Sequence, residues 1–352
     1  MGTDGERRVA VVCDDGAIRI IQEQIPEMKA GMVLVRVHAS LVSPGTELNG
    51  WKTLRTNRQT GKPCTIQRKF GYSNAGVVAR VAPDVKSFEE GDRVACIGYG
   101  YALHTDWALI PQHLCIALPE TVSFEQGSYA MLLATAMQSV RRCEPELGER
   151  VLVVGMGLVG LLTARMHQLA GNYVIGWARH PLQIQMAERL GIDRAEYADD
   201  TQLQAKTWEF TKGYGLDAAV LAFGGPAGLV WDTVCNCMKK SPDGHLMGRV
   251  VMVGGGGIDL KWIPANLDIR IAARTGPGYH DDAWELGESS YPNVFLRWTT
   301  ETNLRLCIDL VAEKKIDVDC LTTHRVNLLN CEQEIGEIID RREEILGLVF
   351  TQ

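Results

Sequence analysis

The stretch from residue 151 to residue 179 limits the possible folds of this chain more than any other part of its sequence. It opens with a short apolar run at 151–154, long enough for one buried parallel strand. A helical pattern follows at 161–169, and a second apolar run lies at 174–177. Between the first strand and the helix stands Gly155-Met156-Gly157-Leu158-Val159-Gly160, a G-x-G-x-x-G. This order of strand, glycine-rich turn, helix and strand predicts a βαβ unit.

Each glycine of this turn has a physical purpose. Gly155 permits a tight turn, Gly157 lets the backbone approach a pyrophosphate, and Gly160 lets the helix pack closely on the strand. The helix N-terminus then offers unbonded N–H groups and the positive end of its dipole to phosphates. The alternative is a close-packed turn that binds no ligand. We predict a dinucleotide site, made of residues 155–160 (including Met156, Leu158 and Val159) with Thr135, Arg179 and Gly254.

Outside this unit, short strands come first, and strands that alternate with helices come later. Apolar and polar residues alternate at 8–40, with turns at Gly16 and Gly31, and further short strands are expected at 70–118. The alternation after residue 150 predicts an α/β fold with a doubly wound parallel sheet. The predicted helices are 123–143, 181–190, 228–238, 301–314 and 328–341, and the later strands are 217–222, 249–253, 267–273, 321–326 and 346–350.

Composition excludes several classes of protein. A formal net charge of −7 argues against a broad nucleic-acid surface. No apolar run reaches the roughly 18 residues of a membrane span, and the first residues contain no long apolar signal segment. Ten cysteines are scattered without a C-x-x-C pair, which favours reduced thiols in a cytoplasmic protein. We therefore expect a small-molecule substrate, with no nucleic-acid and no membrane partner.

The order of these elements resembles the medium-chain dehydrogenase/reductase superfamily, zinc-lacking branch. The resemblance covers nearly the whole chain and is carried by VRVHASLVSPGTE, by the P-x-V-x-x-F-x-x-G-D-R-V run at 83–94, and by the segment that leads into VLVVGMGLVG. It implies a GroES-like catalytic domain over 1–125, completed by about 290–352, and a Rossmann domain over 126–289. It also implies NAD(P)-dependent oxidoreductase activity, and a possible homodimer formed through edge strands such as 267–273.

A narrower resemblance concerns the segment GPGYHDDAWELGESSYPNVFLRWTTETN, which is similar to enzymes that act on sugars, cyclitols and related ring alcohols, including bacteriochlorophyllide dehydrogenases. The zinc positions of the superfamily depart from its pattern. Ser43, Tyr72 and Met131 stand where metal ligands would be, and they are poor zinc donors. Only Cys96 remains of a structural zinc lobe, so we expect no zinc at either site. His104 with Asp106 could be a remnant metal pair, but a surface or pocket histidine on a strand is favoured.

The residues after the second strand bear on the choice of coenzyme. Enzymes that use NAD place an acidic residue about 20 residues beyond the glycines, to hold the ribose 2′-hydroxyl. This chain has Ala178-Arg179-His180-Pro181 there. An arginine grips a phosphate, and a missing carboxylate removes a repulsion, so NADP is favoured and NAD is the alternative.

Without zinc, a side chain must handle the hydroxyl proton. The resemblance puts Tyr72 at the reacting oxygen, with Glu47 setting its protonation, directly or through Lys69 or a water. The alternative for Tyr72 is a tyrosine that caps the core, and for Glu47 a structural contact. His104 is a further catalytic candidate, and Ser43, Thr46, Met131 and Tyr279 are expected to line the substrate pocket.

Three functions stay open at this point. The first is a zinc-independent, NADP-linked dehydrogenase or reductase that acts on a secondary alcohol or ketone of a polyhydroxylated ring. The second is an NADPH-dependent reductase of quinones or enones. The third is a nucleotide-binding protein that has lost catalysis.

Overall fold

A computed structural model describes residues 5–48, 54, 67–258, 265–292 and 294–352. The chain forms two compact units, one of Met1–Ala134 with Thr275–Gln352 and one of Thr135–Arg274. The division falls inside helix α3 (Ala130–Cys143) and after the last strand of the second unit. The expected domain limits, 125/126 and about 289/290, lie near these divisions, and they stay a prediction. The two units are described separately below.

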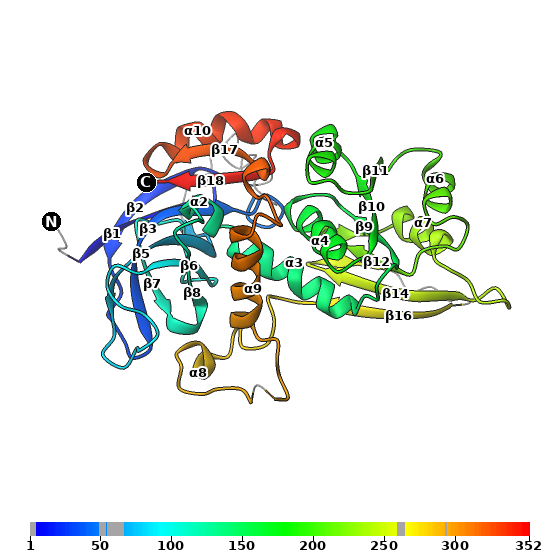
Figure 1. Cartoon of the computed structure of the whole chain (residues 1–352). Coiled ribbons are helices and arrows are strands. Elements are labelled where there is room, and N and C mark those ends of the chain that lie inside the picture. Colours follow the sequence, from blue (N-terminus) through cyan, green and yellow to red (C-terminus); the bar gives the residue numbers. More distant parts are fainter. Residues whose placement is uncertain (1–4, 49–53, 55–66, 259–264, 293) are drawn as a thin grey trace. The chain divides into compact units, whose positions relative to one another are not determined.

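The first unit is built on β-sheets, as its alternating sequence predicts. A seven-stranded sheet has the order β17-β18-β3-β5-β6-β8, with β7 paired to β3, and a three-stranded sheet has the order β2-β1-β4. Its carboxyl-terminal strand, β18, pairs antiparallel with β3 (Figure 1). The strands are β1 (Glu6–Cys13), β2 (Ile18–Gln24), β3 (Met32–Val42), β4 (Gln67–Lys69), β5 (Ser73–Val81), β6 (Arg93–Ile97), β7 (Trp107–Pro111), β8 (Cys115–Ala117), β17 (Thr322–Asn327) and β18 (Gly347–Thr351).

Helices complete the first unit. The predicted helix at 123–143 is two helices, because Ser123 caps the short α2 through a capping box and α3 begins anew at Ala130. The predicted helices near 301–314 and 328–341 are α9 and α10, the second shorter than expected. The helices are α2 (Phe124–Gly127), α8 (Asp282–Glu285), α9 (Thr300–Ala312) and α10 (Cys331–Ile338), with 3-10 turns η1 (Gln112–Leu114), η2 (Asp319–Leu321), η3 (Leu328–Asn330) and η4 (Ile339–Glu344).

The second unit has the predicted doubly wound sheet. Its six strands have the order β11-β10-β9-β12-β14-β16 and pair in parallel. Strand β16 lies at one edge, as the prediction for 267–273 requires. The elements are β9 (Arg150–Val154), α4 (Leu158–Leu169), β10 (Tyr173–Ala178), α5 (Pro181–Arg189), β11 (Arg194–Tyr197), α6 (Leu203–Phe210), β12 (Ala218–Leu221), β13 (Gly225–Pro226), α7 (Leu229–Cys237), β14 (Leu246–Val253), β15 (Gly256–Gly257) and β16 (Ala265–Ala272).

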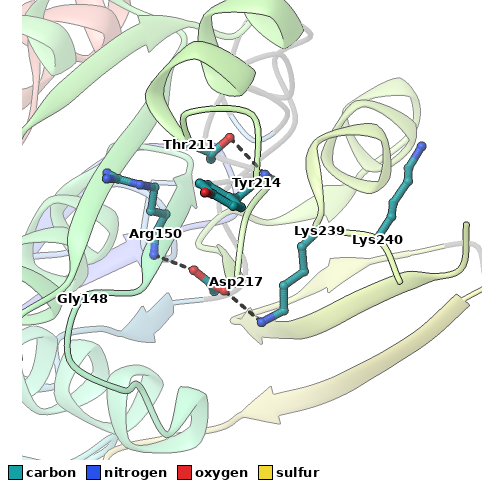
Figure 2. A pocket seen from close by; sticks show the side chains of 8 residues that line it. Gly148, Arg150, Thr211, Tyr214, Asp217, Lys239 and Lys240 are labelled. Carbon is teal, nitrogen blue, oxygen red and sulfur yellow. Dashed lines mark hydrogen bonds and ion pairs between the residues drawn. The ribbon is translucent and has the colours of Figure 1, made fainter. Parts of the chain in front are cut away.

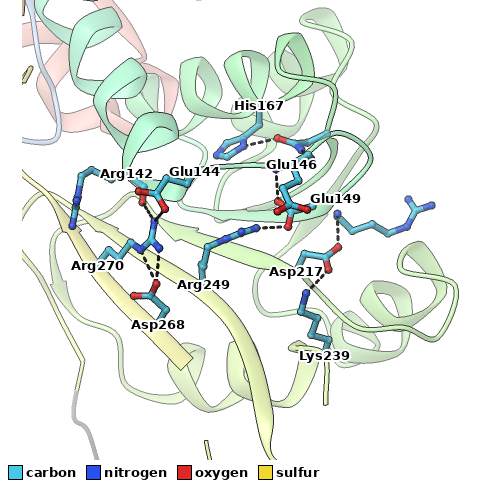
Figure 3. Close-up of polar contacts among 12 residues, drawn as sticks. Arg142, Glu144, Glu146, Glu149, His167, Asp217, Lys239, Arg249, Asp268 and Arg270 are labelled. Atoms are coloured by element: carbon cyan, nitrogen blue, oxygen red, sulfur yellow. Dashed lines mark hydrogen bonds and ion pairs between the residues drawn. The ribbon is translucent and has the colours of Figure 1, made fainter. Parts of the chain in front are cut away.

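Charged side chains link β14 and β16 to the segment between α3 and β9 (Figure 3). Arg249 of β14 pairs with Glu149, just before β9. Arg270 of β16 contacts Asp268 at 2.6 Å and Glu144 at 2.7 Å. These contacts tie the loop between α3 and β9 to the sheet. Within the described part of the chain, no helix combines the length and the apolar character that crossing a membrane requires.

Candidate functional site

Tyr72 directly precedes β5, and a backbone hydrogen bond fixes its position. Its carbonyl oxygen accepts a 3.0 Å hydrogen bond from the Gly98 N–H, directly after β6. The side chain is partly buried, and the side chains of Ser43 and Thr46 are close enough to its hydroxyl group to lower its pKa. Both partners belong to the segment that the sequence singled out, and it follows β3. The structure therefore brings Tyr72, Ser43 and Thr46 together.

Glu47 ends a tight turn that begins at Ser43. The Glu47 N–H donates to the Ser43 carbonyl at 2.8 Å, and the Ser43 N–H donates to Glu47 Oε2 at 2.6 Å. This reciprocal pair fixes the carboxylate beside Tyr72, and only 5% of the Glu47 side chain is exposed. Burial raises the pKa of Tyr72 well above its usual value, and the negative charge of Glu47 raises it further. Tyr72 is therefore a neutral phenol at physiological pH.

His104 lies behind Glu47 and is fully buried. Its Nε2 is 3.3 Å from Glu47 Oε1, and its Nδ1 is 2.8 Å from Ser40 Oγ. The rings of Phe70 and Phe350 pack edge-on against it, with centroids at 4.6 and 4.8 Å. The expectation of a surface or pocket histidine on a strand is wrong, since the ring is enclosed in the core. Among the described residues, its polar neighbours are Glu47 and Ser40.

Two other expected contacts are not made. Asp106 is not a partner of His104, because its carboxylate accepts from the Arg8 backbone and guanidinium, both at 2.8 Å. Lys69 pairs with Glu23 at 2.6 Å rather than with Glu47. A link from Glu47 through Lys69 is therefore wrong, and His104 is the group that faces the Glu47 carboxylate.

Tyr279 and Met131 are both close to Tyr72, through different contacts. The Tyr279 hydroxyl accepts a 2.8 Å hydrogen bond from the Tyr99 N–H, and Tyr279 is close enough to Tyr72 to raise the pKa of its hydroxyl. Met131 is partly buried, and its N–H donates at 3.2 Å to Ser73 Oγ, the residue after Tyr72. Both predicted pocket residues thus belong to the surroundings of Tyr72.

The donor set does not fit a zinc ion. Hydroxyl and thioether groups at Ser43, Tyr72 and Met131 are poor substitutes for thiolate, imidazole or carboxylate. Glu47 and His104 provide two suitable donors, but they face each other. Among the described residues, no group of three or more His, Cys, Asp or Glu side chains could hold a metal ion.

The glycine turn of the second unit has the geometry that a dinucleotide requires. Gly155 has a φ of +89°, which favours glycine, and a Cβ on Gly160 would strike the Gly155 carbonyl oxygen. Gly157 is the N-cap of α4, without a side-chain cap, and has open space around its missing Cβ. The first N–H groups of α4 can therefore face phosphates. Of the other turn residues, Met156 and Leu158 are buried and Val159 is partly buried.

The remaining predicted coenzyme residues occupy separate positions in the second unit. Arg179 follows β10, and its side chain is exposed, with no hydrogen bond or ion pair to another described residue. Gly254 follows β14 with open space at its Cβ position, and Thr135 is partly buried within α3. None of these three positions conflicts with the predicted role, and the role stays a prediction.

Sequence reasoning missed Ser40, Phe70 and Phe350 around His104. Ser40 is on β3 and Phe350 on β18, strands far apart in sequence that pair directly, with Phe350 opposite Ser40. Alternation along β3 predicts an inward side chain at this position. No local sequence pattern could predict that the carboxyl-terminal strand, β18, is the neighbour of β3.

Comparisons with known proteins agree with this architecture. No protein-family model matches the chain. Chicken sorbitol dehydrogenase is 24% identical over 93% of this chain and 92% of its own length. Mouse quinone oxidoreductase is 28% identical over 65% and 66%. Against rat sorbitol dehydrogenase, at 28% identity, the match spans about half of each protein, 47% of this chain and 53% of the enzyme.

Solved structures share the fold over almost the whole chain. Alcohol dehydrogenase from Thermus sp. ATN1 superimposes with a TM-score of 0.75 at 17% identity, covering 98% of this chain and 99% of its own. A dehydrogenase from Sinorhizobium meliloti 1021, solved with NADP bound, has a TM-score of 0.71 at 18% identity, covering 99% of each. The chain therefore has the fold of the medium-chain dehydrogenases and reductases, and its homologues are dehydrogenases and oxidoreductases.

Proposed function

We propose that the protein transfers a hydride between NADP and a secondary alcohol or ketone on a polyhydroxylated ring, without zinc and with Tyr72 as the proton-handling residue. The observation that carries the proposal is the arrangement around Tyr72. Its hydroxyl contacts two further hydroxyl groups, and a buried carboxylate–imidazole pair, Glu47 and His104, stands behind it. The bound nicotinamide ring supplies or accepts the hydride. The protein's own residues must then bind the substrate oxygen and move its proton.

Tyr72 suits this task in the direction of reduction. A neutral phenol donates a hydrogen bond to a carbonyl oxygen, and it gives up the proton as negative charge develops there. The raised pKa keeps the phenol protonated before the reaction and favours rapid reprotonation afterwards. Glu47 and His104 are proposed to hold the proton that restores it. In the direction of oxidation the same proton travels back.

Zinc independence rests on the chemistry of the donors. At the three ligand positions this chain offers hydroxyl and thioether groups, so a Lewis-acid role falls to hydrogen bonds from Tyr72, Ser43 and Thr46. We expect elemental analysis of the purified enzyme to find less than one zinc per chain, and full activity to survive a chelator. Stoichiometric zinc that is needed for turnover would contradict this part.

NADP is proposed as the coenzyme because Arg179 is exposed and uncommitted where the adenosine ribose is expected. A guanidinium can bind the 2′-phosphate with two hydrogen bonds. The Sinorhizobium meliloti relative was solved with NADP, in keeping with this choice. NAD is the alternative.

A polyhydroxylated substrate is proposed because the groups near Tyr72 are hydroxyls that can both donate and accept. Ser43, Thr46 and Tyr279 could each pair with a ring hydroxyl. The sorbitol dehydrogenases among the relatives are named for a polyol. The second candidate is reduction of a quinone or enone. The similarity to mouse quinone oxidoreductase favours it.

A substrate panel separates these functions. Turnover of NADPH is followed by absorbance with cyclic polyhydroxy ketones, enones and quinones, and the reverse reaction with cyclitols and NADP. Turnover with the polyhydroxy compounds supports the proposal, and turnover with enones or quinones alone supports the second candidate. In the variant Tyr72→Phe, turnover should fall at least about 100-fold while NADPH affinity stays unchanged. Binding of coenzyme without turnover on any substrate would leave only a binding role.

We also propose a cytoplasmic homodimer. The nine described cysteines are all free thiols, as expected in a reducing compartment. Among the described strands, β16 is the edge of the six-stranded sheet and pairs with β14 alone, and Ile271 on it is 61% exposed. Light scattering should give twice the monomer mass, and Ile271→Lys should reduce it to the monomer mass. A wild-type monomer at micromolar concentration would contradict the dimer.

A further inference from the structure

A hollow of about 500 Å³ lies at the amino-terminal edge of the six-stranded sheet (Figure 2). We call it the basic hollow. It is shaped by the start of β9, the loop after α6 and the end of α7. Its lining includes Arg150, Tyr214, Gly215, Asp217, Lys239 and Lys240. Three cations and one carboxylate give it a positive charge, on a chain whose net charge is −7.

The single carboxylate of the hollow is already fully used. Asp217 Oδ1 accepts from Lys239 Nζ at 2.8 Å, and Oδ2 accepts from the Arg150 N–H at 2.9 Å. The Arg150 guanidinium and the Lys240 ammonium have no ion pair with another described residue. Figure 2 shows these two side chains at opposite ends of the hollow and pointing apart, so each offers a separate positive charge to an incoming anion.

Arg150 is held in place rather than loose. Its guanidinium carbon lies 4.5 Å from the centre of the Tyr173 ring and 5.4 Å from that of Phe210. These are cation–π contacts, and the guanidinium N–H groups have no hydrogen bond to another described residue. A guanidinium fixed in this way loses little side-chain entropy when it binds a phosphate.

Tyr214 presents an aromatic ring beside these charges. The ring is 81% exposed, yet its loop is well ordered by hydrogen bonds: the Tyr214 N–H donates to the Thr211 carbonyl at 3.1 Å, and the Gly215 N–H donates to Thr211 Oγ1 at 3.1 Å. Gly215 also packs against the Lys239 backbone. An exposed ring on an ordered loop can stack on a flat ligand group.

We propose that the basic hollow binds a small phosphate monoester that carries a planar ring, with the chemistry of a nucleoside monophosphate. Arg150 binds the phosphate, Tyr214 stacks on the ring, and Lys240, at the other end of the hollow, adds positive charge that attracts the ligand. This site is distinct from the predicted coenzyme site. The glycine turn follows the carboxyl end of β9 and Arg150 begins that strand, so roughly 15 Å of extended chain separate them.

The test is calorimetric titration of the full-length protein, first saturated with NADPH so that the coenzyme site is filled. The probes are adenosine 5′-monophosphate, inorganic phosphate and adenosine. We expect the monophosphate to bind more tightly than either part. Affinity should fall roughly tenfold or more in Arg150→Gln and by a smaller factor, about threefold, in Lys240→Gln. Tyr214→Ala should weaken the monophosphate but not inorganic phosphate.

Controls keep the result interpretable. Arg189→Gln removes an exposed cation from the end of α5 and should leave binding unchanged. Lys240 is exposed, so Lys240→Gln should fold normally even if Arg150→Gln proves unstable. The proposal is overturned if the monophosphate does not bind, if NADPH abolishes its binding, or if Lys240→Gln and Arg189→Gln bind it as well as the wild type.

Discussion

Glu47 Oε1 lies 3.3 Å from His104 Nε2, with the two side chains 5% and 0% exposed. Neither of these atoms makes a hydrogen bond among the described residues, so each is the nearest polar group that could satisfy the other. Removing either side chain would leave the other as a buried polar group without a neighbour that could satisfy it, which is costly. Ser40 holds the other ring nitrogen, so the imidazole cannot rotate freely. Glu47 is therefore fixed from two sides, by His104 and by the Ser43 N–H.

The first prediction concerns the charge on Glu47. In Glu47→Gln the side chain keeps its shape, but the negative charge near Tyr72 disappears. Since that charge raises the pKa of Tyr72, the pKa should fall toward the ordinary value of a tyrosine. Ultraviolet difference titration against the Tyr72→Phe variant measures this change. Turnover should drop roughly tenfold to a hundredfold, with NADPH affinity unchanged.

His104 should act through Glu47 and not on the substrate. We expect His104→Phe, which fits an aromatic enclosure, to lower turnover and to alter the pH profile while the KM for the substrate stays constant. Ser40→Ala should cause a smaller change in the same direction. An unaltered pH profile in His104→Phe would show that the histidine serves packing alone.

The second prediction separates two glycines of the same turn. A methyl group at Gly160 would strike the Gly155 carbonyl, whereas the Cβ position of Gly157 is open. Gly160→Ala should therefore lower the free energy of unfolding by about 2 kcal/mol, measured by denaturant titration. Gly157→Ala should fold as well as the wild type but lose NADPH affinity about tenfold, because the methyl group occupies the space of the pyrophosphate.

The two variants are controls for each other. Coenzyme affinity is measured by NADPH fluorescence on protein whose fold has been checked by circular dichroism. If Gly157→Ala binds NADPH normally, the turn is a packing device and the coenzyme lies elsewhere.

The third prediction tests the choice of coenzyme. Arg179→Gln removes the charge but keeps a polar side chain, and it should weaken NADPH about tenfold while NADH affinity stays within error. The matched control is Arg189→Gln, at the other end of α5. Equal losses for NADPH and NADH would mean that Arg179 does not contact the 2′-phosphate.

Local sequence patterns predicted the strands of the second unit that are buried at nearly every position, and they missed a strand that is not. Strands β9, β10 and β12 are short apolar runs between glycine or polar turns, so the sequence located them closely. Strand β11, RAEY, has no fully buried residue and is built of charged and aromatic residues, with its arginine and glutamate paired to each other. Neither an apolar run nor an alternation could reveal it.

The residues of the candidate functional site also fall into two groups, those in local turns and those brought together by strand pairing. The turn from Ser43 to Glu47 and the glycine turn are local, and their residues could be chosen from sequence. The placement of His104 depends on Phe70 and Phe350, which reach it from distant segments through strand pairing. A histidine beside an aspartate suggests a polar surface, and only the pairing of β18 with β3 explains why the ring is buried. The pairing of Lys69 with Glu23 is another non-local choice, between β4 and the end of β2.

The last prediction is a pH dependence of stability that arises from His167 of α4. This histidine is fully buried, its Nδ1 is 2.9 Å from Asn172 Oδ1, and its Nε2 has no described partner. Burial lowers its pKa to about 4, although the hydrogen bond to Asn172 opposes this change. In the unfolded chain the pKa is near 6.5. The folded state therefore holds the neutral ring over a range in which the unfolded state takes up a proton.

The sign of the effect follows from this difference. Stability from this group is complete above about pH 6.5, declines as the pH falls toward 4, and changes no further below that value, a loss on the order of 3 kcal/mol. Urea unfolding of the wild type between pH 4 and 7 should show this decline. In His167→Gln the decline should be much shallower, even if the variant is less stable at pH 7. His245→Gln, which alters a partly exposed histidine in the same unit, should keep the wild-type slope. If His167→Gln retains that slope as well, then other groups cause the loss of stability in acid.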